Sequence, residues 1–235
     1  MEGEKFPPFT LDVNGGYIRA MATRGTRKKT AEKPHYHHGD LRRALLDASL
    51  ALISEEGFGA LSLREVARRA GVTHAAPYRH FEHKEALLVA VAEEGFRVMK
   101  ARMQERMARE TSPEGRLVEC GVAYVLFAME HPAHFRVMFG PHFTQPPKLG
   151  PPGGDLDSFG LLVDSITQGQ RAGVFHEGEP LSLALTCWSL VHGLSSLLVD
   201  RKLEMAGVIT VAQAEKLALE QTRLLLRGLT RATSN

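Results

Sequence analysis

The segment Leu61–Leu88, LSLREVARRAGVTHAAPYRHFEHKEALL, constrains the fold most, because its helix-start and helix-stop signals lie close together. Ser62, followed three residues later by Glu65, predicts a capping box at a helix start. Gly71 is a typical stop for that helix, because glycine adopts the left-handed conformation that ends helices without strain. A second short helix then follows after a tight turn. The segment therefore predicts a helix-turn-helix unit.

A longer helix is predicted before this unit and another after it. The first begins with Asp40 as its N-cap and ends near Gly57. Its apolar face consists of Leu41, Leu45, Ala48 and Leu52. Within the unit, we expect Thr73 to cap a third helix that runs through about Phe81. The fourth helix is expected to begin near His83.

The rest of the chain also favours helices, because it contains no sustained alternation of apolar and polar residues. Further helices are predicted over residues 113–130, 131–140, 155–172, 181–203 and 211–231. A loop rich in proline and glycine, Gly140–Asp155, separates two of them. The expected fold class is therefore all-α, with an N-terminal three-helix unit and a C-terminal helical domain.

The third helix of the unit starts with small uncharged residues: Thr73, Ala75 and Ala76. A generic three-helix bundle has no need of slim residues there. A helix that reads DNA does, because its backbone and side chains must approach base edges in the major groove. We therefore interpret residues 36–84 as a DNA-binding domain, with a generic bundle as the alternative.

Charge supports a polyanionic partner. The formal net charge is only +2, but residues 1–110 carry 19 Lys or Arg and 15 Asp or Glu. Only Glu32 and Asp40 oppose eight basic residues near the N-terminus: Arg19, Arg24, Arg27, Lys28, Lys29, Lys33, Arg42 and Arg43. We expect residues 1–35 to form a flexible basic arm, which suggests a polyanionic partner such as nucleic acid, with a solvated tail as the alternative.

The sequence also indicates the cellular compartment in which the protein is expected. Two cysteines far apart, Cys120 and Cys187, fit a reducing compartment and small buried side chains. The first twenty residues lack the apolar core of a signal peptide. Leu181–Val199 is long enough to span a bilayer, but serine, threonine and histidine interrupt it. We expect a buried helix there, no membrane association and a cytoplasmic protein.

The last two predicted helices are apolar on more than one side. In the first, Leu181, Leu185, Trp188, His192, Ser195 and Val199 form one stripe, and Leu183, Leu190, Leu194, Leu197 and Leu198 lie elsewhere. The last helix is similarly wide, with Leu217, Leu224, Leu225, Leu226 and Leu229. A helix that is apolar on two sides must be covered on both. We therefore predict a homodimer that forms through these two helices.

The segment GFGALSLREVARRAGVTHAAPYRHFEHKEALLVAV resembles the DNA-binding domain of the tetracycline-repressor (TetR) family of bacterial regulators. The matching residues are Gly57, Leu63, Ala67, Gly71, Val72, Tyr78, His80, Phe81, Lys84 and Leu87. The later CWSLVHG is similar to the Trp–His–Gly signature of one group of C-terminal domains in that family. The resemblance implies a homodimeric transcriptional regulator, usually a repressor, that a small-molecule effector releases from a palindromic double-stranded DNA operator.

The resemblance also assigns roles by position. Thr73, His74, Ala75 and Pro77 would face base edges, and Tyr78, His80, Lys84 and Arg64 would contact phosphates. Phe81 would belong to the core. Residues 85–235 would form the ligand-binding and dimerisation domain. No cofactor is implied.

An apolar effector pocket is expected in that domain, from the aromatic residues near 124–143 and in the CWSLVHG segment. Its predicted lining is Phe127, Phe135, Phe139, Phe143, Trp188 and His192. The alternative function is a ligand-binding protein or an enzyme that uses His192 as a base in this cavity. No carboxylate on the same helical face orients that histidine, and we expect no catalytic residue.

The histidines of the unit do not predict a metal site. His74 and His80 are six residues apart, whereas two ligands on one helix need a spacing of three or four to share a face.

Overall fold

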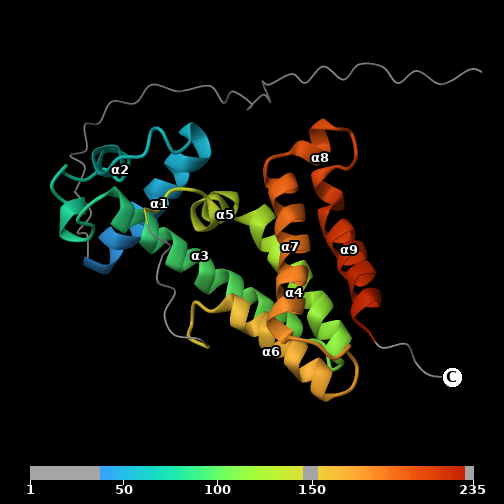
Figure 1. Ribbon diagram of the computed structural model, residues 1–235. Helices are drawn as coiled ribbons and strands as arrows, with labels where there is room; N and C mark the ends of the chain where they lie inside the picture. The colour runs from blue at the N-terminus through green and yellow to red at the C-terminus, as the bar shows by residue number, and fades with distance from the viewer. Residues whose placement is uncertain (1–37, 145–152, 231–235) are drawn as a thin grey trace, which may run out of the picture. The chain divides into compact units, whose positions relative to one another are not determined.

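The computed structural model describes residues 38–144 and 153–230, and these residues form helices (Figure 1). No β-strand occurs in the described parts of the chain, where a single antiparallel bridge pairs Phe175 with Thr230. The all-α prediction is confirmed. The predicted basic arm, residues 1–35, and the middle of the predicted loop lie outside the described residues.

The first two helices follow the sequence signals closely. Helix α1 spans His38–Glu56 and α2 spans Leu63–Arg69. The Ser62 hydroxyl accepts a hydrogen bond from the Glu65 amide at 3.1 Å, as an N-cap should. The Glu65 carboxylate pairs with Arg68 rather than completing the capping box. Asp40 lies inside α1, so its prediction as the N-cap was wrong.

The turn after α2 depends on Gly71, which has φ of +69°. The backbone reverses there, and the Val72 amide donates to the Ala67 carbonyl at 3.0 Å. Arg69 pairs with Glu55 and Glu56 at the end of α1, which fixes the two helices to each other.

The predicted third helix, from Thr73 to Phe81, does not form as an α-helix. The segment is a turn followed by the 3-10 helix η1, Pro77–Arg79. The cause is Pro77, which has no amide hydrogen to donate to the Thr73 carbonyl. The Ala76 amide bonds to that carbonyl instead, at 2.9 Å, and the chain continues with the short-range bond from Arg79 to Ala76.

Helix α3, Lys84–Met107, is the longest of the described helices. It begins where His83 accepts a hydrogen bond from the Ala86 amide through Nδ1, at 3.1 Å. This agrees with the start predicted near His83. The buried face of α3 packs against the N-terminal unit at one end and against the C-terminal helices at the other. Its buried residues include Leu87, Leu88, Val91, Phe96, Met99 and Met103.

The C-terminal helices lie close to their predicted ranges. They are α4 (Pro113–Glu130), α5 (Pro132–Phe139), α6 (Ser158–Arg171), α7 (Pro180–Val199), α8 (Lys202–Met205), η2 (Val211–Gln213) and α9 (Ala214–Leu229). The helix predicted over 181–203 is divided at Arg201, which has φ of 56°. Helix α4 packs against α3, α7 and α9, and α7 and α9 lie side by side (Figure 1).

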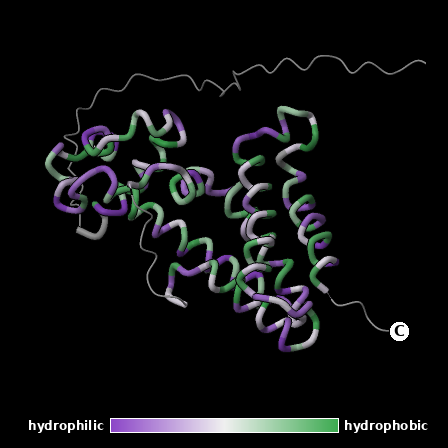
Figure 2. Tube along the Cα trace, in the orientation of Figure 1, coloured by the Kyte–Doolittle hydropathy of each residue, from purple (hydrophilic) through white to green (hydrophobic). Residues whose placement is uncertain are grey.

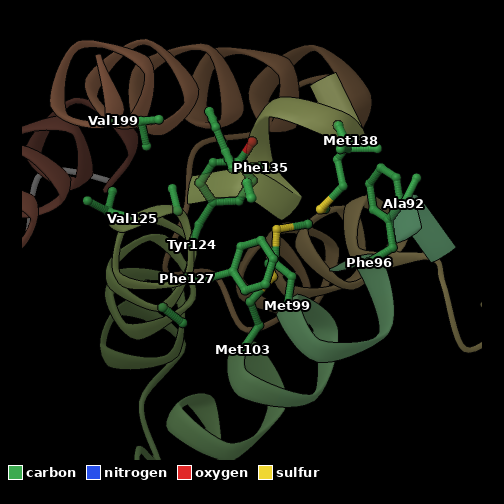
Figure 3. Close-up of a cluster of buried hydrophobic side chains, with 14 of the residues drawn as sticks. Ala92, Phe96, Met99, Met103, Tyr124, Val125, Phe127, Phe135, Met138 and Val199 are labelled. Atoms are coloured by element: carbon green, nitrogen blue, oxygen red, sulfur yellow. The ribbon is translucent and has the colours of Figure 1, made fainter. Parts of the chain in front are cut away.

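A continuous hydrophobic core joins these helices. Figure 3 shows side chains of α3, α4 and α5 meeting in it, with Met99, Phe127 and Met138 pointing toward one another. Hydrophobic and near-neutral residues follow most of α7 in Figure 2. By length and composition this helix could cross a membrane. It packs instead against α4, α6 and α9, as expected for a helix of a bundle.

We predict that Gly169→Ala destabilises the fold. A Cβ atom at this position would lie 2.2 Å from two ring carbons of Phe175, which is 1% exposed and has no space to move into. Overpacking of this kind costs about 1–3 kcal/mol. The expected result is a lower urea midpoint at matched protein concentration.

The matched control is Gly59→Ala, because no heavy atom lies within 4 Å of a Cβ atom there. Its free energy of unfolding should change by less than about 0.5 kcal/mol. An unchanged midpoint for Gly169→Ala would contradict the packing of Phe175 against α6.

Candidate functional site

The segment between α2 and α3 presents a contiguous exposed surface. Thr73, His74 and Ala75 are exposed in the turn, and Tyr78 in η1 is 60% exposed. A large aromatic side chain in water on a short, tightly turned segment is typical of a contact surface rather than of a core. Arg79, which the sequence interpretation did not select, is exposed beside Tyr78.

Two of the predicted DNA-facing residues are turned inward. Pro77 is buried. His80 is half-buried, and its Nε2 atom is fully enclosed without a hydrogen-bond partner. The exposed surface therefore consists of Thr73, His74, Ala75 and Tyr78, and Pro77 shapes the backbone beneath it.

Phe81 anchors this surface. It is 3% exposed, so its prediction as a core residue is confirmed. The Arg42 guanidinium of α1 lies 5.7 Å from the centre of its ring, in cation–π geometry.

Lys84 and Arg64, the remaining predicted phosphate contacts, begin or flank helices and are exposed. The Lys84 ammonium donates to the Phe58 carbonyl at 3.2 Å, which holds it near the start of the α1–α2 connection. Arg64 follows Leu63 at the start of α2. These two positive charges thus lie on the two helices that flank the 73–78 segment, Arg64 on α2 and Lys84 on α3.

The second feature is a cavity of about 320 Å³ in the C-terminal helices. Helices α3, α4, α6, α7 and α9 supply most of its wall, and Phe139 of α5 closes one part. This volume is in the range of pockets that bind small molecules. The surface of the cavity is almost entirely apolar.

Two of the six predicted pocket residues, Phe139 and Trp188, line this cavity. Phe127 is fully buried in the core and lies beside His131. Phe135 and His192 do not line the cavity, and their ring centres lie 5.4 Å apart. Phe143 is half-buried and is not part of the lining.

Tyr124 links the cavity wall to these rings. Its hydroxyl accepts a hydrogen bond from Trp188 Nε1 at 3.2 Å and lies 2.8 Å from His192 Nδ1. An indole N–H can only donate, so the tyrosine proton is left for His192. Burial lowers the pKa of His192, which favours the neutral imidazole that this bond requires. Burial likewise raises the pKa of Tyr124.

Several lining residues were not selected from the sequence. They include Phe96, Met99, Met103, Leu117, Cys120, Gly121, Ser158, Leu162, Cys187, Val191 and Thr222. On α3, the spacing of Phe96, Met99 and Met103 places them on one helical face, a signal that also describes an ordinary core. Gly121 was detectable only in three dimensions, where α9 approaches it so closely that a Cβ atom would lie 2.6 Å from Thr222.

The arrangement around His192 offers binding rather than acid–base chemistry. Its hydrogen-bond partner is a tyrosine, and its ring is surrounded by Phe135, Phe139 and Trp188. A catalytic histidine is usually oriented by a carboxylate. Among the described residues, no group of three His, Cys, Asp or Glu side chains could hold a metal ion.

Comparison with known families adds two matches. Residues 45–91 match the model described as bacterial regulatory proteins, tetR family. Residues 117–220 match the model described as tetracyclin repressor-like, C-terminal domain. The first match includes the exposed surface, and the second includes α4 to α7 and most of the cavity.

Solved structures agree with these matches. A protein of unknown function from Rhodococcus sp. RHA1 is 30% identical, with a TM-score of 0.69 over 85% of this chain and 100% of that one. A bacterial regulatory protein of the tetR family from Rhodococcus RHA1 is 23% identical, with a TM-score of 0.63 over 82% and 98%. A TetR family transcription regulator from Marinobacter aquaeolei VT8 is 18% identical, with a TM-score of 0.63 over 82% and 96%.

Proposed function

This chain belongs to the tetR family of bacterial regulatory proteins, and from that membership we propose that it is a cytoplasmic repressor. It binds a palindromic operator as a homodimer and leaves the operator when a small molecule binds. The observation that carries the proposal is the exposed Thr73–Tyr78 surface, held by Pro77 and Phe81, in a chain that also contains a separate apolar cavity.

At the operator, Thr73, His74 and Ala75 approach base edges in the major groove, because all three are exposed, and Thr73 and Ala75 are small enough for close approach. Tyr78 donates its hydroxyl to a phosphate oxygen, and Lys84 and Arg64 add charge. We assign Pro77 the role of fixing the backbone rather than touching a base, because its ring is buried. His80 reaches phosphate only if its enclosed Nε2 is uncovered.

Dimerisation through α7 and α9 is supported by leucines that the single chain leaves in water. Leu181, Leu185 and Leu197 of α7 are 48%, 45% and 41% exposed, and Leu224 of α9 is 60% exposed. Each would be removed from water by a second copy of the same helices, as in other isologous interfaces. The dimer brings two reading surfaces to successive major grooves, about 34–36 Å apart.

Helix α5 connects the cavity to the DNA-facing unit. Phe139 at its end lines the cavity, and the helix also packs against α1 and α3. On its other side, His134 Nε2 lies 3.5 Å from the Glu94 carboxylate, which accepts a hydrogen bond from Arg43 of α1 at 2.8 Å. A ligand that displaces Phe139 therefore acts on α1 through one short helix.

The residues after α5 make a second connection. The His142 ring stacks on Phe58, with their centres 3.5 Å apart, and the Phe58 carbonyl holds Lys84. The Thr144 amide donates to the Glu85 carboxylate at 2.9 Å. A shift of α5 would thus also reach the start of α3, where a phosphate-binding lysine stands. Ligand binding favours a dimer in which the spacing of the two reading surfaces no longer fits the operator.

We predict that Tyr78→Ala and Lys84→Ala weaken binding to a palindromic site near the gene that encodes the protein. Loss of the Lys84 charge should also lower the slope of log affinity against log salt by about 1. A mobility-shift assay at several salt concentrations measures both quantities.

The matched control is Arg109→Ala, which removes one positive charge beyond the far end of α3. Its side chain is 62% exposed, and its partner Glu105 is also a surface residue. Variants at Tyr78 and Lys84 that bind as tightly as this control would contradict the proposed DNA surface.

We predict that Leu197→Glu and Leu224→Glu convert the dimer to monomers, because each buries a charge in the proposed interface. Sedimentation velocity measures the mass, and circular dichroism checks that the variants remain helical. Val98→Glu on α3, where the valine is 38% exposed, is the control and should remain dimeric. A wild-type monomer, or α7 and α9 variants that stay dimeric, would exclude this interface.

A further inference from the structure

The polar groups in the cavity wall are almost all satisfied by the protein itself. The Tyr124 hydroxyl is bonded to Trp188 and His192. The Thr222 hydroxyl donates to the Ala218 carbonyl of its own helix at 2.8 Å. A ligand can therefore gain little from hydrogen bonds to these groups without breaking existing ones.

The described part of the wall also carries no positive charge. Among the described residues, its lining contains no lysine, arginine or histidine. Lys100 of α3 is not part of it, and its ammonium donates to the Gly154 carbonyl at 2.6 Å. An anionic headgroup in the cavity would therefore be buried without a partner, which is strongly unfavourable.

One carboxylate, Asp157, stands at the edge of the cavity. It caps α6, and its two oxygens accept from the amides of Gly160 and Gly153, each at 2.7 Å. The carboxylate is thus directed at the backbone rather than at a ligand. Its negative charge disfavours anions further, and one acceptor site on each of its oxygens is already occupied by the backbone.

The cysteine thiols keep the wall neutral. Burial raises the pKa of Cys120 to about 12 and that of Cys187 to about 11, so both are protonated at neutral pH.

Ser158 is the exception among the lining hydroxyls. It occupies the first turn of α6, and its backbone amide donates to the Leu156 carbonyl at 3.0 Å. Ser158 lines the cavity, and its side chain makes no hydrogen bond to the described residues. Apart from the Asp157 carboxylate at its edge, the described wall therefore offers one free donor in an otherwise apolar surface.

We propose that the cavity binds an uncharged, largely hydrocarbon molecule with one oxygen acceptor, such as an alcohol, ketone or ester, directed at the Ser158 hydroxyl. The assignment rests on the proposed regulator function, since it names the chemical class of the effector. The apolar body of the ligand packs against the α3 side chains, and its oxygen accepts from Ser158 at the start of α6.

Trp188 makes this class testable without DNA, because it is the single tryptophan of the chain and lines the cavity. The experiment titrates the full-length dimer with 1-decanol, decanoate and decylammonium, below the concentrations at which they form micelles, and follows tryptophan fluorescence at pH 7.5. We expect decanol to bind at least about tenfold more tightly than either charged analogue, because either charge would lose its hydration on entering an almost entirely apolar cavity.

Variants test the site. Ser158→Ala should weaken decanol binding by about 2- to 10-fold, the loss expected for one neutral hydrogen bond, and Ser158→Thr should restore it. Leu162→Phe adds volume inside the wall and should abolish the response. If this variant does not fold, as judged by circular dichroism, the Ser158 pair still decides the matter.

A charged analogue that binds as tightly as decanol, or a wild-type protein whose fluorescence responds to none of the three, overturns the proposed ligand class. The Ser158 assignment is overturned if Ser158→Ala binds decanol as wild type does. These titrations contain no operator, so they are independent of the mobility-shift assay. A protein that binds decanol but binds no operator in that assay would refute the proposed regulation and leave the ligand class intact.

Discussion

The continuity of α3 is the constraint on which the rest of the structure depends. One unbroken helix carries Leu87 and Leu88 in the core of the DNA-facing unit and Met99 and Met103 in the cavity wall. Because a helix transmits displacement along its axis as a rigid element, the two regions cannot be treated as independent. The His83 cap fixes where α3 begins. The packing of α5 along the side of α3 determines which element can displace it.

The local signals of the sequence determined most of the helical pattern, and the exceptions have physical causes. Ser62 and Gly71 act locally, so α2 and its stop could be predicted. Pro77 is the main exception: it has no amide hydrogen, and the segment predicted to form a third helix becomes a turn and a 3-10 helix. Its burial also depends on tertiary packing, which periodicity alone does not reveal.

The cavity shows a different limit. Aromatic content suggested an apolar pocket, and Phe139 and Trp188 do line the cavity, but composition could not separate lining from core. Phe127 is fully buried, whereas small residues such as Gly121 and Ser158 face the space. Which face of each helix is left uncovered depends on how five helices meet. The apolar wall and the Ser158 side chain within it therefore emerge only from the three-dimensional arrangement, and the proposed ligand class rests on them.

The account requires that cavity and operator be coupled, and thermodynamic linkage makes that coupling reciprocal. The most direct measurement is the decanol dissociation constant, read from Trp188 fluorescence with and without saturating operator DNA. We predict weaker decanol binding in the presence of the operator, by the same factor by which decanol weakens operator binding. Equal dissociation constants in the two conditions would contradict the account, because the cavity would then have no influence on the DNA-facing surface.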